Sequence, residues 1–400
     1  MDRGCVQAPE QAQHVAVASE LVTMMLAFQP LNDPLRKQQI HALSRFAKFF
    51  SFHLAQLGDV MDKMLMAAVY LGSGDGDLAT LSTGTQTIRY SACTSMAHLC
   101  KNIDPARPAA PHLMPNSPAR VISPSHEIVQ QQANINLLEN ALPHALGRFQ
   151  EMQSQLRLGE EALLIEGLLC LFNYLPTFEF RQQYITDLLE PKIREWNEAA
   201  AANQLDSIAA IDAVMRLHAI EGAEPVAAPD FMALKHRLSI FASVTRRLTA
   251  LPPAGSADGA AVHPFKDLLP HVLPHVCAVI VAVDNLWQPG ALDGVMSAEA
   301  ARMLLGAGEW EQKQTIGKRH TAADEPAVAA AEGGQHGGRA WLGNLQIYLQ
   351  QVRETCYELA EAAFKPEFQV RRFSLPPPQD CLHLACFSSS LNYRLCAARG

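Results

Sequence analysis

The chain has 400 residues, a formal net charge of −8 and 48% hydrophobic residues, with only 18% charged residues. This much apolar material fills a sizeable core and excludes disorder along the whole chain. The negative balance excludes a globally basic nucleic-acid-binding protein, although a local basic patch remains compatible with it. Aromatic residues make up only 7%, and abundant Ala, Leu and Gln favour helices over strands.

Cysteine usage and the lack of long apolar runs indicate the cellular compartment in which the protein works. Nine cysteines are spread along the chain without a CxxC motif, which argues against a disulfide framework and favours a reducing environment. The N-terminal stretch lacks the apolar core of a signal peptide, and the longest apolar run, 276–283, is too short to span a bilayer. We therefore expect a soluble, intracellular protein without membrane insertion.

Apolar residues at spacings of three and four predict a series of helices. A proline-rich loop at 104–125 interrupts the series, because proline removes a hydrogen-bond donor and clashes with the preceding turn. Alternation of period two, which would indicate strands, is not found. The expected helices cover 36–57, 59–71, 86–102, 126–151, 158–175, 180–200, 205–220, 230–250, 263–286, 297–307 and 341–363.

This pattern predicts an all-α fold, a HEAT-like solenoid of helix pairs. One pair cannot bury its apolar face alone, whereas stacked pairs do so and leave a long surface for a partner. The expected division is a lead-in with a short helix at 1–35, a repeat array at 36–317, a low-complexity linker at 318–340, a final repeat helix at 341–364 and an irregular tail at 365–400.

Two groups of histidines and cysteines have spacings found in metal sites. His271 and His275 lie four residues apart, with Cys277 close by. The glutamate of an HExxH site is missing, however, and two prolines interrupt this stretch, so a structural role is favoured. The Cys/His group at 381–386 lies in the irregular tail and is a weaker signal. We predict no metal site.

Motifs for catalysis are also weak. The glycine-rich GSGDGD at 72–77 follows a predicted helix and lacks the lysine of a P-loop. No GxSxG elbow occurs. The carboxylates fall on predicted helix faces, where solvation is the ordinary expectation. The sequence therefore predicts a protein that is not an enzyme and holds no cofactor.

One helix carries a concentration of positive charge. The segment 231–250 contains Lys235, Arg237, Arg246 and Arg247 and no acidic residue. Basic groups at the ends of a helix can hold phosphates of a nucleic acid. An ordinary solvated helix face is the alternative interpretation. These four residues are the candidate RNA-binding residues.

Several segments resemble, in collinear order, the exportin-5 and Hasty family of nuclear export receptors. The closest resemblance is LRLGEEALLIEGLLCLFNYLPTFEFRQQYITDLLEPKIREW at 156–196, an apolar helix followed by an aromatic residue, a basic-Gln pair and a leucine-rich helix with a Pro and a terminal Trp. The other segments are 87–102, 205–222, 231–250, 286–317 and 341–364. Together the resemblance covers about 36–364.

The resemblance implies a karyopherin of the importin-β superfamily, with HEAT repeats. Such receptors carry double-stranded RNA hairpins, such as microRNA precursors, through the nuclear pore with Ran-GTP, and they contact nucleoporins. They shuttle between nucleus and cytoplasm, and they read the duplex by shape and phosphates. By this resemblance, Lys235 and Arg237 match an Arg-rich helix start, and Arg246 and Arg247 match a basic pair at a helix end.

The resemblance covers a middle part of longer receptors. The N-terminal repeats that hold Ran-GTP in the superfamily have no counterpart in this sequence, so weak or no Ran-GTP binding is expected for this chain alone. A HEAT-like scaffold that binds only proteins, without RNA, is the competing interpretation. The surroundings of the charges on 231–250 discriminate the two, because an RNA site needs further basic groups beside them.

Overall fold

The structure, a computed structural model, confirms the all-α prediction. The regular elements of the described part are helices, and the β pairing within it consists of two isolated bridges, Leu251–Val262 and Asp293–Met296. Within this part, no helix combines the length and apolar character needed to cross a membrane. The structure describes residues 7–50, 54–71, 82–103, 141–202, 209, 233–255, 259–288, 290–297, 301, 304 and 337–368.

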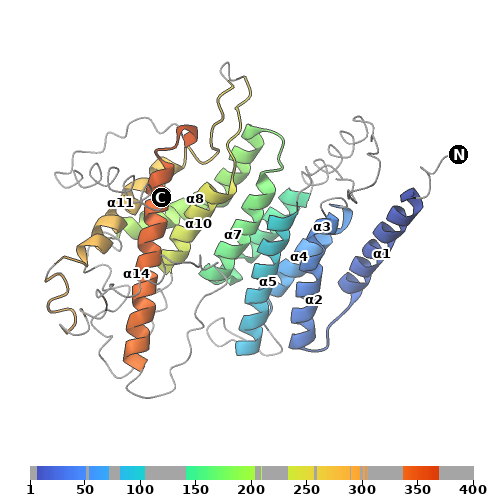
Figure 1. The fold of residues 1–400 in the computed structure, drawn as a ribbon, viewed down its shortest axis with the longest axis horizontal. Coiled ribbons are helices and arrows are strands. Elements are labelled where there is room, and N and C mark those ends of the chain that lie inside the picture. The colour runs from blue at the N-terminus through green and yellow to red at the C-terminus, as the bar shows by residue number, and fades with distance from the viewer. Residues whose placement is uncertain are drawn as a thin grey trace, which may run out of the picture.

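The helices lie side by side in an elongated molecule (Figure 1). The α-helices of the described part are, in chain order, α1 (Gln7–Ala27), α2 (Asp33–Arg45), α3 (Ala47–Phe50), α4 (Leu57–Ala68), α5 (Thr83–Asn102), α7 (Leu158–Phe172), α8 (Phe178–Ala201), α10 (Ala233–Arg247), α11 (Leu269–Asn285) and α14 (Gly337–Ala362). A further helical stretch covers 141–152. The described part also contains the short 3-10 helices η1 (Leu54–Gln56), η3 (Gln153–Gln155) and η5 (Pro366–Phe368).

One row of helices consists of α2, α5, α7, α10 and α14. Each of these helices packs against the next, from α2 to α14, and Figure 1 shows this row along the length of the molecule. Gly167 allows α7 to approach α5 closely, because a Cβ there would lie 3.2 Å from the Cα of Ala97 on α5. The row therefore forms a continuous helical layer.

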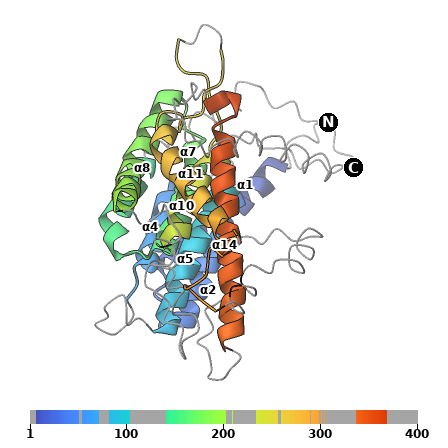
Figure 2. The same cartoon turned by 90° about the vertical axis from the view of Figure 1, so that its left-hand side faces the viewer.

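The second row consists of α4, the helix at 141–152, α8 and α11. Arg148 contacts Asp62 of α4 across 3.9 Å, α8 packs against α11, and the helix at 141–152 borders a groove along α8. In chain order the described helices of the two rows alternate, from α2 through α4, α5, 141–152, α7, α8, α10 and α11 to α14. Figure 2 shows α8 and α14 on opposite sides of the molecule.

A continuous apolar core lies between the rows. The stripe predicted in 36–57 is buried at Ile40, Leu43 and Phe50. Trp196 of α8 is fully buried, meets the ring of Phe241 edge-on at 5.7 Å, and donates its indole N–H to the carbonyl of Val272. Burial of a large aromatic side chain with its polar atom satisfied stabilises the junction of α8, α10 and α11.

The single helix predicted over 36–57 is wrong. The structure begins α2 at Asp33, after Asn32 accepts a hydrogen bond from the Leu35 N–H, which is the arrangement of a helix N-cap. The helix ends at Arg45, and the N–H of the C-cap residue Phe46 bonds the Leu43 carbonyl in a tighter turn. The buried stripe continues through α3 and η1 because the chain bends without leaving the core.

The predicted helix over 263–286 begins later, at Leu269. His263 is held by its neighbours, with its N–H on the Glu367 carbonyl and its ring stacked on Phe368. Pro274 lies inside α11 without ending it, since a proline removes only one internal hydrogen bond and the burial of the apolar face offsets that loss.

Other boundaries also differ. The lead-in holds a 21-residue helix, α1, rather than a short one, and α14 begins at Gly337 inside the expected linker. The proline-rich loop at 104–125, the predicted helix at 205–220 apart from residue 209, and the tail beyond 368 lie outside the described residues.

Candidate RNA-binding site on α10

The candidate residues divide between the two ends of α10. Lys235 and Arg237 lie in its first turns, and Arg246 and Arg247 form its last two residues. Arg246 lies nine positions after Arg237 in the helix, which corresponds to about 14 Å along the axis. Cations in the last turn interact favourably with the helix dipole, so the arginine pair is placed well for helix stability as well as for binding.

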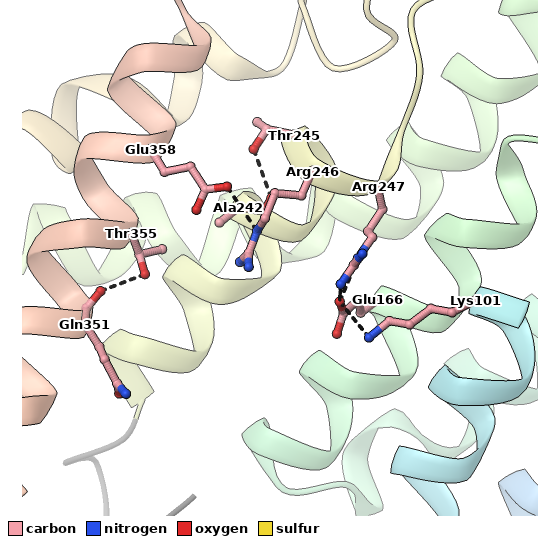
Figure 3. Close-up of polar contacts among 9 residues, drawn as sticks. All are labelled: Lys101, Glu166, Ala242, Thr245, Arg246, Arg247, Gln351, Thr355 and Glu358. Atoms are coloured by element: carbon pink, nitrogen blue, oxygen red, sulfur yellow. Dashed lines mark hydrogen bonds and ion pairs between the residues drawn. The ribbon is translucent and has the colours of Figure 1, made fainter. Parts of the chain in front are cut away.

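Arg247 belongs to an ion cluster that joins three helices of one row (Figure 3). Its Nε lies 2.8 Å and its terminal nitrogen 2.5 Å from Oε1 of Glu166 on α7. Lys101, in the last turn of α5, lies 3.0 Å from the same oxygen. The Glu166 side chain is only 10% exposed. Two cations therefore neutralise one nearly buried carboxylate.

The electrostatics of this cluster keep Glu166 ionised. Burial alone would raise the pKa of Glu166, but the charges and hydrogen bonds of Lys101 and Arg247 outweigh it and hold that pKa below its usual range. Cys170, one turn further along α7, has its pKa raised to about 11 by burial. Its thiol stays protonated at neutral pH and is no activated nucleophile.

Arg246 has a different partner. Its Nε lies 3.1 Å from Oε1 of Glu358 on α14, and it also donates to the Ala242 carbonyl (Figure 3). Both side chains of this ion pair are about two-fifths exposed. An exposed pair of this kind contributes little to stability, so Arg246 can exchange Glu358 for a phosphate at small cost.

Lys235 and Arg237 are half-buried near the start of α10. The Nε atom of Arg237 is buried and has no hydrogen-bond partner among the described residues. These two residues do not meet Arg246 and Arg247 in one cluster, because the body of the helix separates them. The structure thus brings together only the arginine pair of the four candidates.

The sequence pattern does not reveal Lys101 as a member of this site. Its approach to Arg247 depends on the packing of α5, α7 and α10, which leaves no local pattern around 101. With Glu166 and Glu358 included, the three cations Lys101, Arg246 and Arg247 leave an excess of one positive charge at this end of the row. The cluster is suited to positioning a single phosphate group.

The histidine pair with the spacing of a metal site, His271 and His275, lies on α11. His271 is exposed, and burial lowers the pKa of His275. The described residues contain no group of three or more His, Cys, Asp or Glu side chains placed to hold a metal ion. The glycine-rich 72–77 and the Cys/His group at 381–386 lie outside the described residues.

The role of this site rests on its own geometry and on the resemblance of the sequence. Its described parts are an ion cluster across α5, α7 and α10 and an exposed arginine–glutamate pair between α10 and α14. No protein-family model matches the chain, and no curated protein matches it either.

Proposed function

We propose that this chain is a segment of an exportin-5/Hasty-like nuclear export receptor that binds double-stranded RNA hairpins, such as microRNA precursors. In this proposal the alternating rows form a HEAT-like solenoid, and the whole receptor shuttles between nucleus and cytoplasm with Ran-GTP and nucleoporins as partners. The collinear resemblance over 36–364 supports it. The protein acts by binding and release, without chemistry of its own.

The observation that carries the proposal is the positive excess at the C-terminal end of α10. Arg246 is exposed there beside the cluster of Lys101 and Arg247, and within the described residues Glu166 and Glu358 are the carboxylates that pair with these cations. A-form RNA is recognised by its shape and its phosphates, so a few correctly spaced cations suffice for contact. Such contacts make binding strongly dependent on salt.

The test is a titration of the full chain with a labelled RNA hairpin bearing a two-nucleotide 3′ overhang, from low to physiological salt. The informative variant is Lys235→Glu/Arg246→Glu, because neither substitution removes the Arg247–Glu166 contact that stabilises the row. We expect salt-dependent binding that this variant weakens at least about tenfold, with a salt slope reduced by about 2.

The matched control is Arg148→Glu/Arg194→Glu, which changes the net charge equally on the second row. This control should bind the hairpin as the parent chain does, and circular dichroism should show unchanged helicity for both variants. An equal loss of RNA affinity in the two double variants would show that only the net charge of the chain matters. That result would contradict an RNA site on α10. Absence of binding at low salt would contradict it as well.

A scaffold that binds only proteins is the second candidate. The observation that favours it is the use of both arginines in internal ion pairs, which leaves little positive charge for phosphates in a chain of net charge −8. Under this alternative, the hairpin binds no more tightly than an unrelated duplex DNA in the same titration, and the Lys235→Glu/Arg246→Glu variant changes nothing.

A further inference from the structure

A groove follows the outer face of α8 on the second row. Between α8 and the helix at 141–152 it has a volume of about 720 Å³, and between α8 and the start of α11 a further 560 Å³. Glu190 and Arg194 line both parts, so the two are continuous. The α8 residues that line the groove recur at spacings of three and four from Phe180 to Ala201, a length of about 31 Å. We call this surface the α8 groove.

The α8 groove is acidic. Asp187, Glu190 and Glu198 line it and are exposed, and Arg194 is the one basic side chain that α8 adds to the lining. None of the three carboxylates forms an ion pair within the described residues. Exposed acids along a hollow surface attract a positively charged partner and repel phosphates.

Glutamates on the neighbouring helix α7 behave differently. Glu160 is buried against Arg89 at 2.8 Å, and Glu161 is buried against Lys192 at 2.8 Å. The fold therefore supplies cations to the acids that it buries and leaves the acids of the α8 groove without them. The exposed acids of the groove are therefore available to a positively charged partner.

Apolar groups accompany the acids at both ends of the α8 groove. Phe180 is 49% exposed beside Leu146 in one part, and Ile193 and Leu268 line the other. Phenylalanine is enriched at protein–protein interfaces, so an exposed Phe side chain beside such a groove is suited to contact a partner.

We propose that the α8 groove binds a linear basic segment of a partner protein. Its Lys or Arg side chains pair with Asp187, Glu190 and Glu198, and an apolar side chain packs on Phe180. A segment of about ten residues in extended form spans the groove. The α8 groove lies on the other row from the arginines of α10 (Figure 2), so this inference does not depend on RNA binding.

The test uses the full chain and a fluorescein-labelled 15-residue peptide that carries alternating Lys and apolar residues, including one Phe. Fluorescence anisotropy should show saturable binding that weakens about tenfold in Asp187→Asn/Glu190→Gln and about threefold in Phe180→Ala. A peptide with Glu in place of every Lys should not bind, and added salt should weaken the complex.

The matched control is Glu354→Gln/Glu361→Gln, which removes two exposed carboxylates from α14 on the first row. It should bind the basic peptide as the parent chain does. Equal weakening in this control, equal binding of the acidic peptide, or no saturable binding at low salt would each overturn the proposal. All the substituted groove residues are exposed, so the variants should keep the helicity of the parent chain.

Discussion

At the residue scale, His263 is a neutral histidine enclosed by the fold. Its ring is stacked on Phe368 at 4.2 Å, Nδ1 accepts the Phe265 N–H at 3.1 Å, and Nε2 lies 3.3 Å from the Leu248 carbonyl. These contacts satisfy the neutral ring with its proton on Nε2. Burial lowers the pKa of His263 to about 4, because the charged form would be cut off from water.

This histidine makes the stability of the fold dependent on pH. The unfolded chain takes up a proton near pH 6.5, whereas the folded chain does so only near pH 4. Stability therefore falls as the pH is lowered from 6.5 to 4, by about 3 kcal/mol at most for this group. Chemical denaturation measures the free energy of unfolding at pH 7 and at pH 4.5. The difference between these two values should be smaller for His263→Gln than for the parent chain. An equal difference would contradict this assignment.

Residue types on single helices were predictable, but their partners were not. The sequence marked Arg246 and Arg247 because no acid lies within 231–250. Their actual partners, Glu358 and Glu166, lie on α14 and α7, so only the packing of the rows reveals them. The expectation that carboxylates are solvated is wrong for Glu166, which is nearly buried, because pairing with cations offsets the cost of burial.

At the element scale, α7 is the central helix of its row. Besides packing on α5 and α10, it carries buried glutamates at 160, 161 and 166 that pair with cations of α5, α8 and α10. Ion pairs of fixed geometry select one relative placement of neighbouring helices. The apolar sequence of 158–175 predicted the helix and its burial, while the acids within it gave no signal of their partners.

Gly167 tests the packing of α7. A Gly→Ala change inside a helix normally gains about 1 kcal/mol of stability, but here the new Cβ would lie 3.2 Å from the Ala97 Cα, a backbone atom that moves only with its helix. We expect Gly167→Ala to destabilise the fold by about 1–2 kcal/mol and to lower the thermal midpoint.

The control for this prediction is Gly147→Ala. Gly147 lies in the helix at 141–152, and its added Cβ would meet no atom within 4 Å, so this variant should be more stable than the parent chain. Thermal unfolding monitored by circular dichroism measures the stability of both variants. A gain of stability in Gly167→Ala equal to that of Gly147→Ala would mean that α5 and α7 do not approach as closely as described.

The apolar periodicity of the sequence predicted where helices occur, but it often did not predict the residues at which they begin and end. The stripe through Ile40, Leu43 and Phe50 predicted burial correctly, because apolar spacing of three and four reports which face meets the core. The break at Phe46 and the late start of α11 at Leu269 depend on turn geometry and on contacts with η5, which lies about a hundred residues away from His263. Such long-range contacts leave no local pattern.

At the scale of the whole molecule, the two rows separate two kinds of surface. The end of α10 on the first row carries the exposed arginine and its ion cluster, and the α8 groove on the second row carries exposed acids. Positive charge favours contact with phosphates, and exposed carboxylates disfavour it. In our two proposals RNA therefore contacts the first row, and a basic protein segment binds the second.

Hydrogen–deuterium exchange of the full chain with and without the RNA hairpin at low salt is the most direct test of RNA binding by the first row. We expect slower exchange at the C-terminal ends of α5 and α10 and in the part of α14 around Glu358, with α8 unchanged. Slower exchange along α8 alone, or no change in any of these helices, would contradict the assignment of RNA binding to the first row.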